Sequence, residues 1–418
     1  MAANPVDLKK VMRRRAESMD ATGYEEIVVA VIGSVDSGKS STVGTLVGNI
    51  LDDGKGLSRS IVFVHPHERE TGRTSDISYQ YMKDEEAKRI ITFVDLAGHE
   101  TYLKTTLSGL TATTPDFAIV CVSDKITKMT KEHMGLCYAL GIPFMILFTK
   151  CDIVPLDIQA ALITSVKKMV TSQKSKIYHF KDTQDFKMIE NYQNNKIVPF
   201  LLTSNKTGQG LDLVRHALRV FKPREKFLPD GFVVEHIYTV PGHGIVLSGV
   251  SGHDINLGDE LYMGPFSKGD FITVIVRSIH NDYRHDIKTL PAGKRGCLAI
   301  GVRTKDKNNY VLRKGIILSK EKPKNVCKEF IADVNILHHA TTIKPGYHAF
   351  VNCGMLREPV KFVEMYDSDG SILSHIRAMD RVRIKMRFTR GLNYVPTGQQ
   401  IAFREGTVRG FGVVTQTL

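Results

Sequence analysis

Eight consecutive residues, 33–40, have the types and spacing needed to hold a phosphate chain. They read GSVDSGKS and fit the pattern G-x-x-x-x-G-K-[ST] at every defined position. The two glycines let the backbone turn so that successive N–H groups face one anion-sized hollow. Lys39 would bring a full charge to the β- and γ-phosphates, and the hydroxyl of Ser40 is placed to ligate Mg²⁺. The predicted nucleotide-binding residues of this phosphate loop are Gly33, Ser34, Val35, Asp36, Ser37, Gly38, Lys39, Ser40 and Ser41.

A second motif, DLAGH at residues 95–99, carries groups that would surround the same phosphates. Asp95 ends the apolar run IITFVD, where its carboxylate would hold the hydration shell of Mg²⁺ across from Ser40. Gly98 can bring its N–H against a γ-phosphate because a residue without Cβ approaches most closely. His99 would then lie beside that phosphate. The motif therefore predicts a metal carboxylate and two groups that face the terminal phosphate.

The motif TKCD at residues 149–152 indicates which base the nucleotide carries. Asp152 offers two acceptor oxygens that match the N1–H and the exocyclic amine of guanine. Adenine lacks that pair of donors, and one good bidentate base contact discriminates by ~1–3 kcal/mol. An aspartate after an apolar strand is by itself usually a helix cap, but here it follows two phosphate motifs at suitable separations. The predicted base-binding residues are Thr149, Lys150 and Asp152, with Ser204, Asn205 and Lys206 from a later loop.

A long polar loop, residues 49–79, separates the first two motifs. A structureless loop of this length in a compact domain is usually functional. Thr74 could reach Mg²⁺ only while a γ-phosphate is present, which would make the loop a switch. A surface insertion is the alternative, and the histidines at 65 and 67 are interpreted as solvated residues rather than metal ligands.

The elements that must position these motifs change in kind along the chain. From residue 27 to about 221, short apolar runs without alternation, such as FAIVCV and FMILF, alternate with helical stretches. Strands buried on both faces have this pattern, which indicates a mainly parallel sheet under helices. After Pro223, alternating segments with glycine turns replace the helices and predict β-barrels or sandwiches. KEKPKN, residues 320–325, is a plausible linker between two of them.

Composition bounds the class of protein. A chain of 418 residues suggests about three domains. The net charge of +13 favours a polyanionic partner such as RNA, although basic proteins without such roles are common. Six cysteines without a C-x-x-C pair argue against a disulfide framework or a zinc site. The N-terminus has no apolar signal core and no run reaches the ~18 residues of a membrane span. We therefore expect a cytoplasmic protein without a membrane partner.

Five segments, GSVDSGKSS, GRTS, DLAGHE, TKCD and SNK, resemble in order the nucleotide motifs of translational GTPases. The stretch FVVEHIYTVPGHGIVLSG and the later GQQIAFREG are similar to the two barrels of elongation factor Tu. Three features resemble most closely the GTP-binding protein one/two branch: the form E-x-G-R-T-S at residues 70–75, the serine in SVDSGKS, and TKCD. The resemblance implies an α/β P-loop GTPase domain followed by two all-β barrel domains. The expected domains are an N-terminal arm over 1–24, a GTP-binding domain over 25–222, and β-barrels over 223–320 and 321–418.

The same resemblance implies roles for individual residues. Lys39 would hold phosphate, Asp36 would help to neutralise charge at its position in the phosphate loop, and His99 would orient the attacking water, so these three are the expected catalytic residues. Mg²⁺ would be held by Ser40 and Thr74, and by Asp95 through water. Asp152 and Lys150 would hold guanine, and Ser204 would close the base pocket.

Three positions depart from the family pattern. Thr149 replaces the usual asparagine, which we expect to remove an amide tie between the base loop and the phosphate loop and to weaken nucleotide affinity. Arg73 occupies an apolar gate position, and either an open gate or a cation near the developing phosphate charge could raise intrinsic hydrolysis. His280 aligns with a glutamate that many elongation factors place near the terminal adenosine of tRNA.

One further segment, RVRIKMRF at residues 381–388, alternates cations with apolar side chains. On a strand this places four cations on one face. Either a solvated barrel face or a ridge that binds an RNA backbone would look this way. The cations are Arg381, Arg383, Lys385 and Arg387.

We expect a monomeric GTPase that binds GTP or GDP with Mg²⁺ and hydrolyses GTP to switch conformation. The resemblance implies action with aminoacyl-tRNA at the ribosome, in elongation or translation quality control, and a nucleotide-exchange factor as a further partner. The alternative is a GTP-dependent binding module that recruits RNA-decay or regulatory proteins, with turnover incidental.

Overall fold

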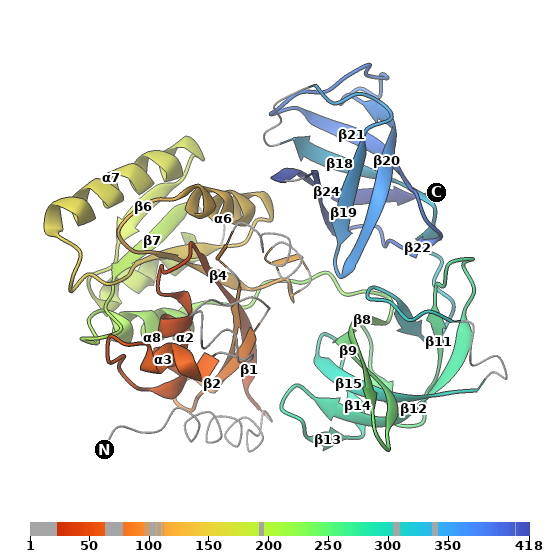
Figure 1. Ribbon diagram of the computed structural model, residues 1–418, viewed down its shortest axis with the longest axis horizontal. Helices are drawn as coiled ribbons and strands as arrows, with labels where there is room; N and C mark the ends of the chain where they lie inside the picture. The colour runs from red at the N-terminus through yellow and green to blue at the C-terminus, as the bar shows by residue number, and fades with distance from the viewer. Residues whose placement is uncertain are drawn as a thin grey trace. The chain divides into compact units, whose positions relative to one another are not determined.

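The protein divides into two compact units, Met1–Glu225 and Lys226–Leu418 (Figure 1). The computed structural model describes residues 23–62, 78–96, 98–99, 106, 110–111, 113–191, 196–303, 310–336, 342–405 and 407–418. None of the helices in these ranges is long and apolar enough to cross a membrane.

The first unit is built on a seven-stranded sheet in the order β2-β3-β1-β4-β5-β7-β6. All neighbouring strands pair in parallel except β2 and β3, which are antiparallel. Strands β3, β4 and β5 are buried at every residue, which confirms the predicted parallel sheet under helices. The bounds are β1 Glu25–Gly33, β2 Ser78–Asp84, β3 Arg89–Asp95, β4 Phe117–Val122, β5 Phe144–Phe148, β6 Lys176–His179 and β7 Ile197–Leu202.

Helices cover both faces of this sheet. In Figure 1, α2, α3 and α8 lie on one side and α6 and α7 on the other. Apolar residues of α2 and α8 share one core with alternate residues of β1, β3, β4 and β5. The bounds are α2 Lys39–Gly48, α3 Leu57–Val62, α6 Lys128–Ala139, α7 Leu156–Ser172 and α8 Leu211–Val220, with the 3₁₀ helix η2 at Thr183–Asn191.

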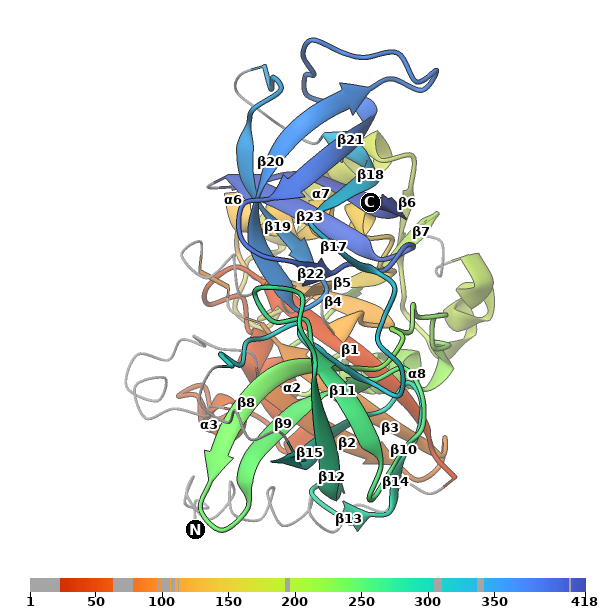
Figure 2. The same cartoon turned by 90° about the vertical axis from the view of Figure 1, so that its right-hand side faces the viewer.

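The first barrel of the second unit closes through strand β11, which pairs with both β16 and β12. The order is β11-β16-β8-β9-β15-β12-β13, and Figure 2 shows β8, β9 and β15 side by side. The bounds are β8 Phe232–Val240, β9 Gly244–Ser251, β10 Ile255–Asn256, β11 Glu260–Gly264, β12 Ile272–Asn281, β13 Asp286–Ile287, β14 Thr289–Leu290, β15 Arg295–Val302 and β16 Ile317–Ser319.

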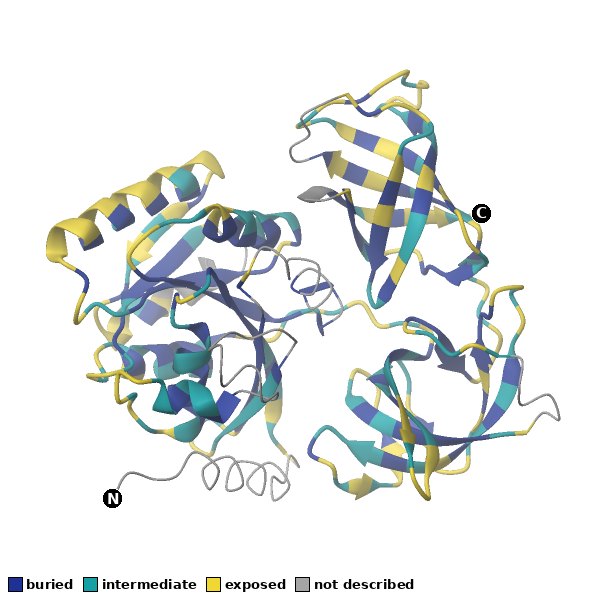
Figure 3. Ribbon diagram, viewed as in Figure 1, coloured by how far each residue is buried: buried dark blue, intermediate teal, exposed yellow. Residues whose placement is uncertain are grey.

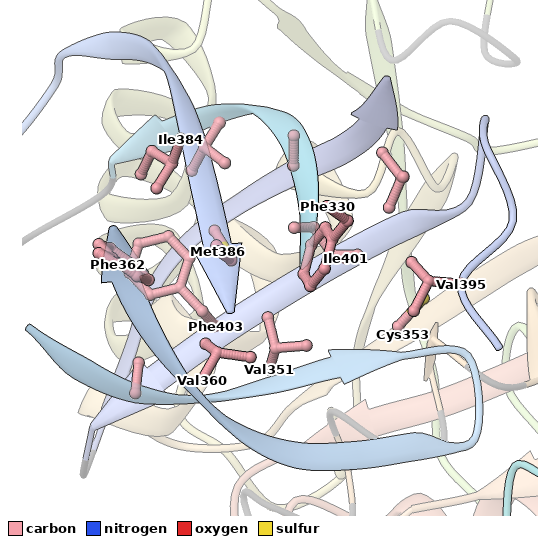
Figure 4. Packing of buried hydrophobic residues seen from close by; sticks show 14 of the residues in the cluster. Phe330, Val351, Cys353, Val360, Phe362, Ile384, Met386, Val395, Ile401 and Phe403 are labelled. Carbon is pink, nitrogen blue, oxygen red and sulfur yellow. The ribbon is translucent and has the colours of Figure 1, made fainter. Parts of the chain in front are cut away.

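The second barrel is closed in the order β18-β21-β20-β19-β23-β24. Buried and exposed residues alternate along its strands (Figure 3). The inward residues, Phe330, Phe362 and Phe403 among them, fill the core shown in Figure 4. The bounds are β17 Val326–Cys327, β18 Glu329–Ile336, β19 His348–Cys353, β20 Leu356–Tyr366, β21 Arg381–Phe388, β22 Asn393–Tyr394, β23 Gln400–Glu405 and β24 Thr407–Thr417.

The predicted architecture, one α/β domain followed by two all-β barrels, is confirmed by these sheets. Helix α8 ends at Val220 before β8 begins at Phe232, and β16 ends at Ser319 before β17 begins at Val326. Both barrels belong to one compact unit, and the division at 222/223 and 320/321 stays a prediction. Of the predicted arm, only residues 23 and 24 lie within the described ranges.

Candidate nucleotide-binding site

The phosphate loop joins the end of β1 to the start of α2, as the sequence predicts. Its backbone is left-handed at Asp36, with φ 59°, and at Gly38, with φ 84°. Glycine is required at 33 because a Cβ there would overlap the carbonyl oxygen of Cys121 and lie 2.6 Å from Ser37 Oγ. Ser37 Oγ donates to the Ser34 carbonyl at 2.8 Å. The loop is thus held as a compact turn at the carboxyl edge of the sheet.

Lys39 lies inside this turn. Its side chain is buried, and Nζ donates to the Ser34 carbonyl at 2.8 Å. Burial lowers the pKa of the Lys39 ammonium, and the nearby carboxylates of Asp95 and Asp36 oppose that shift. Gly98 packs directly against the loop, since a Cβ there would overlap Lys39 Nζ and lie 2.7 Å from the Gly33 carbonyl oxygen. The structure therefore brings the first two motifs together around the Lys39 ammonium group.

Two predicted metal-binding groups are in contact. Ser40 Oγ donates to Asp95 Oδ2 at 2.6 Å, and Asp95 is fully buried at the end of β3. A hydroxyl and a carboxylate are the oxygen ligands that Mg²⁺ prefers, directly or through its waters, so these residues fit the metal. Thr74 and Arg73 lie outside the described residues, as does the segment 63–77 of the predicted switch loop. The described part of that loop is not structureless, because Leu57–Val62 form α3.

The base loop is tied to the phosphate loop, contrary to the expectation for Thr149. Its hydroxyl donates to the Ser37 carbonyl at 2.8 Å and lies 3.3 Å from the carbonyl of Val122. Thr149 is buried. Threonine is shorter than asparagine, but the phosphate loop lies close to Thr149. A Cβ added at Gly38 would lie only 3.3–3.5 Å from atoms of the Thr149 side chain. The close approach lets a hydroxyl replace the amide.

The second base-side loop, residues 204–206, is joined to its neighbours by hydrogen bonds. Cys151 N–H donates to the Thr203 carbonyl at 3.2 Å, which holds the loops after β5 and β7 side by side. Ser204 is buried, and its Oγ accepts the N–H groups of Lys206 and Thr207 at 3.2 and 3.1 Å. Asn205 Nδ2 donates to Thr42 Oγ1 on α2 at 3.1 Å.

These loops border a cavity of about 200 Å³. Nine predicted site residues line it: Val35, Asp36, Gly38, Lys39, Ser40, Ser41, Gly98, His99 and Lys150. His99 and Asp152 are exposed, and Asp152, two residues after Lys150 in the chain, does not line the cavity. The sequence reasoning missed one wall, formed by Asp52, Gly54, Lys55, Gly56 and Arg59. The paired glycines and basic residues in DDGKGLSR were the available signal.

The structure describes the two barrel features singled out in the sequence, the cations of β21 and His280. Three of the four cations on β21 form ion pairs: Arg383 with Asp333 at 3.1 Å, Lys385 with Glu329 at 3.2 Å, and Arg387 with Glu329. This neutralisation favours the solvated barrel face over the RNA ridge. His280 lies on β12, opposite Asp286 of β13 and Cys297 of β15.

Comparison with known proteins adds an independent finding. Residues 25–243 match the family model described as the elongation factor Tu GTP binding domain. GTP-binding protein 1 of Xenopus laevis is 33% identical over 96% of this chain and 65% of its own length. GTP-binding protein 2 of Homo sapiens is 31% identical over 98% of this chain and 72% of its own. The chain thus spans about two thirds of the length of these relatives.

Among solved structures, the translation elongation factor SelB from Methanococcus maripaludis, in complex with the GTP analogue GppNHp, has a similar fold. The TM-score is 0.69 at 20% identity, and the match covers 95% of this chain and 80% of the other.

Proposed function

The chain belongs to the elongation factor Tu GTP-binding family, and from that premise we propose that it binds GTP with Mg²⁺ and hydrolyses it. The observation that carries the proposal is the meeting of three separate motifs at one cavity. Lys39, Gly98 and Lys150 come from loops that follow β1, β3 and β5, and all three line that cavity.

In the proposed reaction, water attacks the γ-phosphate in line and the protein stabilises the charge that develops. Lys39 and the N–H groups of the phosphate loop would contact the β- and γ-phosphates. Ser40 and Asp95 would hold Mg²⁺, which neutralises phosphate charge when bound, and Thr74 would complete its ligands. His99 at the cavity wall would orient the water, while Asp36 would balance charge beside the loop.

The guanine preference is tested by Asp152→Asn. An amide cannot accept both guanine donors, so we expect GTP affinity to fall and xanthosine triphosphate affinity to rise, by ~1–3 kcal/mol each. Asp157→Asn is the matched control, because Asp157 is also an exposed acid after β5 but lies in the first turn of α7 and does not line the cavity. An equal loss for both nucleotides in Asp152→Asn would contradict the assignment.

We further propose that the GTPase acts with aminoacyl-tRNA at the ribosome in elongation or quality control, as a cytoplasmic monomer served by an exchange factor. A surface on the second barrel supports the RNA contact. The Arg357 guanidinium lies 5.2 Å from the ring centre of Phe350, which is 45% exposed. Arg357 has no ion-pair partner among the described residues. A cation over an exposed aromatic ring suits both the phosphates and the bases of RNA.

The tRNA proposal is tested by filter binding of charged, uncharged and initiator tRNA with GTP and with GDP. Arg357→Ala should weaken the GTP-dependent binding of charged tRNA, whereas the ion-paired Arg387→Ala on β21 should change it little. Equal losses in both variants would remove the surface from the proposal.

The alternative, a GTP-dependent module that recruits RNA-decay or regulatory proteins, differs in its response to ribosomes. GTP hydrolysis by the wild-type protein should rise when purified ribosomes and charged tRNA are added. An unchanged rate would favour the binding module.

A further inference from the structure

A wall of the nucleotide cavity is formed by residues 52–59, which lie within the loop predicted over 49–79 but belong to none of the five nucleotide motifs. This wall includes the turn before α3 and the first residues of the helix, and its Lys55 and Arg59 line the same cavity as Lys39 and Gly98. Figure 1 shows α3 beside α2, the helix that follows the phosphate loop.

Tight packing fixes the position of this wall. A Cβ at Gly44 of α2 would overlap the carbonyl oxygen of Ser58, so the two helices touch through backbone atoms. Three residues of α3 itself are buried, namely Ser58, Ile61 and Val62. The Asp52 N–H donates to the Asn205 carbonyl at 2.8 Å, which ties the start of the wall to the base-side loop. The backbone of the wall is therefore anchored at both ends.

The acids of this wall are bound to its own backbone. Asp52 Oδ1 accepts the Ser58 N–H at 3.0 Å. Asp53 Oδ1 accepts the N–H groups of Lys55 and Leu57 at 2.7 and 3.1 Å. These hydrogen bonds shape the turn and direct both carboxylates to main-chain donors rather than to the basic side chains.

The cations of the wall have no such partner. The Arg59 guanidinium lies over Gly56, where a Cβ would overlap Nε and come within 2.9 Å of Cζ. Within the described ranges, neither Arg59 nor Lys55 forms an ion pair or a side-chain hydrogen bond. The cavity thus gathers Lys39, Lys55, Arg59 and Lys150 against two acids, Asp36 and the backbone-bound Asp52. An excess of cations around one hollow suits a polyanion.

We propose that Arg59, assisted by Lys55, is a further nucleotide-binding residue that contacts the phosphate chain from the wall formed by residues 52–59. The inference rests on the proposed guanine-nucleotide function of the cavity and adds a binding residue that the nucleotide motifs do not contain. Guanidinium binds phosphate through paired N–H donors, so this contact would hold the nucleotide from a second side.

Equilibrium binding of GDP and GTP to the full chain, by displacement of a fluorescent nucleotide, tests the proposal. Arg59→Ala should weaken binding by about tenfold or more, Arg59→Glu should weaken it further, and Arg59→Lys should restore part of the loss. The control is Lys131→Ala, which removes a cation from the exposed face of α6 and should leave affinity within about twofold. Thermal unfolding without nucleotide should be the same in all variants.

The nucleotides also locate the contact. A loss shared by GDP and GTP assigns Arg59 to the α- or β-phosphate, and a loss confined to GTP assigns it to the γ-phosphate. Affinities within about twofold of wild type in both Ala and Glu variants would overturn the proposal. The proposal would also be overturned if Arg59→Ala and Arg59→Glu lost the same nucleotide affinity and both had a lowered unfolding temperature. Failure of the wild-type protein itself to prefer guanine nucleotides would instead overturn the proposed function.

Discussion

The hydroxyl of Thr149 joins two loops whose residues are 112 positions apart. Thr149→Val keeps the shape but leaves the buried Ser37 carbonyl without its donor, so we expect a loss of about 1–3 kcal/mol in the unfolding free energy. GDP affinity should fall in parallel, because the phosphate loop would lose its support. Thr149→Ser retains the hydroxyl and should stay near wild type in both urea unfolding and GDP binding. If Thr149→Val matched Thr149→Ser in both measurements, the Thr149 hydrogen bond would contribute to neither stability nor GDP affinity.

His133 on α6 is a buried group whose charge state should control acid stability. Neither ring nitrogen has a hydrogen-bond partner in the described part of the chain. Burial, followed by the charge of Lys39, lowers the pKa of His133 to about 3. Below pH 6.5 the His133 side chain therefore binds a proton in the unfolded chain but stays neutral in the folded protein. The unfolding free energy consequently falls as the pH drops. Between pH 7 and pH 5 this amounts to about 2 kcal/mol.

The variant His133→Leu isolates that contribution. Urea unfolding at pH 7 and at pH 5 should show a pH-dependent loss that is smaller than in wild type by about 2 kcal/mol. An identical loss in the two proteins would show that His133 takes up a proton without cost in the folded state.

At the scale of elements, the contact between α2 and α3 reverses the usual effect of a helix glycine. Gly→Ala inside a helix normally stabilises by about 1 kcal/mol. In Gly44→Ala the new Cβ would overlap the Ser58 carbonyl, so the helices must separate and we expect a net loss of about 1–3 kcal/mol. Displacement of α3 would also move Arg59 and weaken nucleotide binding.

The control for this change lies on another helix of the same unit. A Cβ at Gly135 of α6 would meet no atom within 4 Å. Gly135→Ala should therefore stabilise the protein by up to about 1 kcal/mol in thermal unfolding. Stabilisation by both substitutions would mean that α2 and α3 are not in backbone contact.

At the scale of the whole molecule, Arg313 links the two barrels of the second unit. From the first barrel, its Nη1 donates to Asn393 Oδ1 at 2.6 Å and lies 3.2 Å from Glu358. Its Nη2 donates to the Leu392 carbonyl at 3.1 Å. Arg313→Ala leaves these acceptors unpaired and should lower the unfolding free energy by about 1–3 kcal/mol.

The barrels should then unfold less cooperatively, and proteolysis should increase at residues 320–325 between them. Arg303→Ala is the control, because the exposed Arg303 pairs with Glu260 inside the first barrel. We expect that control to stay within about 1 kcal/mol of wild type in urea unfolding. A single cooperative transition in Arg313→Ala with wild-type stability would contradict the link.

Much of the architecture could be predicted because each signal is local. The phosphate loop is one contiguous segment. Apolar runs such as FAIVCV and FMILF indicate buried parallel strands from their own residues alone. The change to alternating segments after Pro223 likewise marks the barrels. Base recognition by Asp152 and the metal ligation by Thr74 remain predictions, the latter because Thr74 lies outside the described residues.

The errors and omissions share one physical cause, which is dependence on distant partners. The sequence left two interpretations of the β21 cations open, a solvated barrel face and an RNA-binding ridge, because the acids that pair with them lie on β18 and β20. The expected loss of the Thr149 tie failed because the distance between two loops decides whether a hydroxyl can replace an amide.

By itself, the sequence determined the phosphate loop, the types of the elements and their order, since these depend on side chains that are neighbours along the chain. Only the tertiary structure decided which loops share a cavity, which cations are neutralised and which cations face the nucleotide site. Those outcomes depend on strand order and helix packing, which bring together residues separated by dozens of positions. Arg59 illustrates the difference, because its place at the cavity follows from a glycine on α2 rather than from any motif around it.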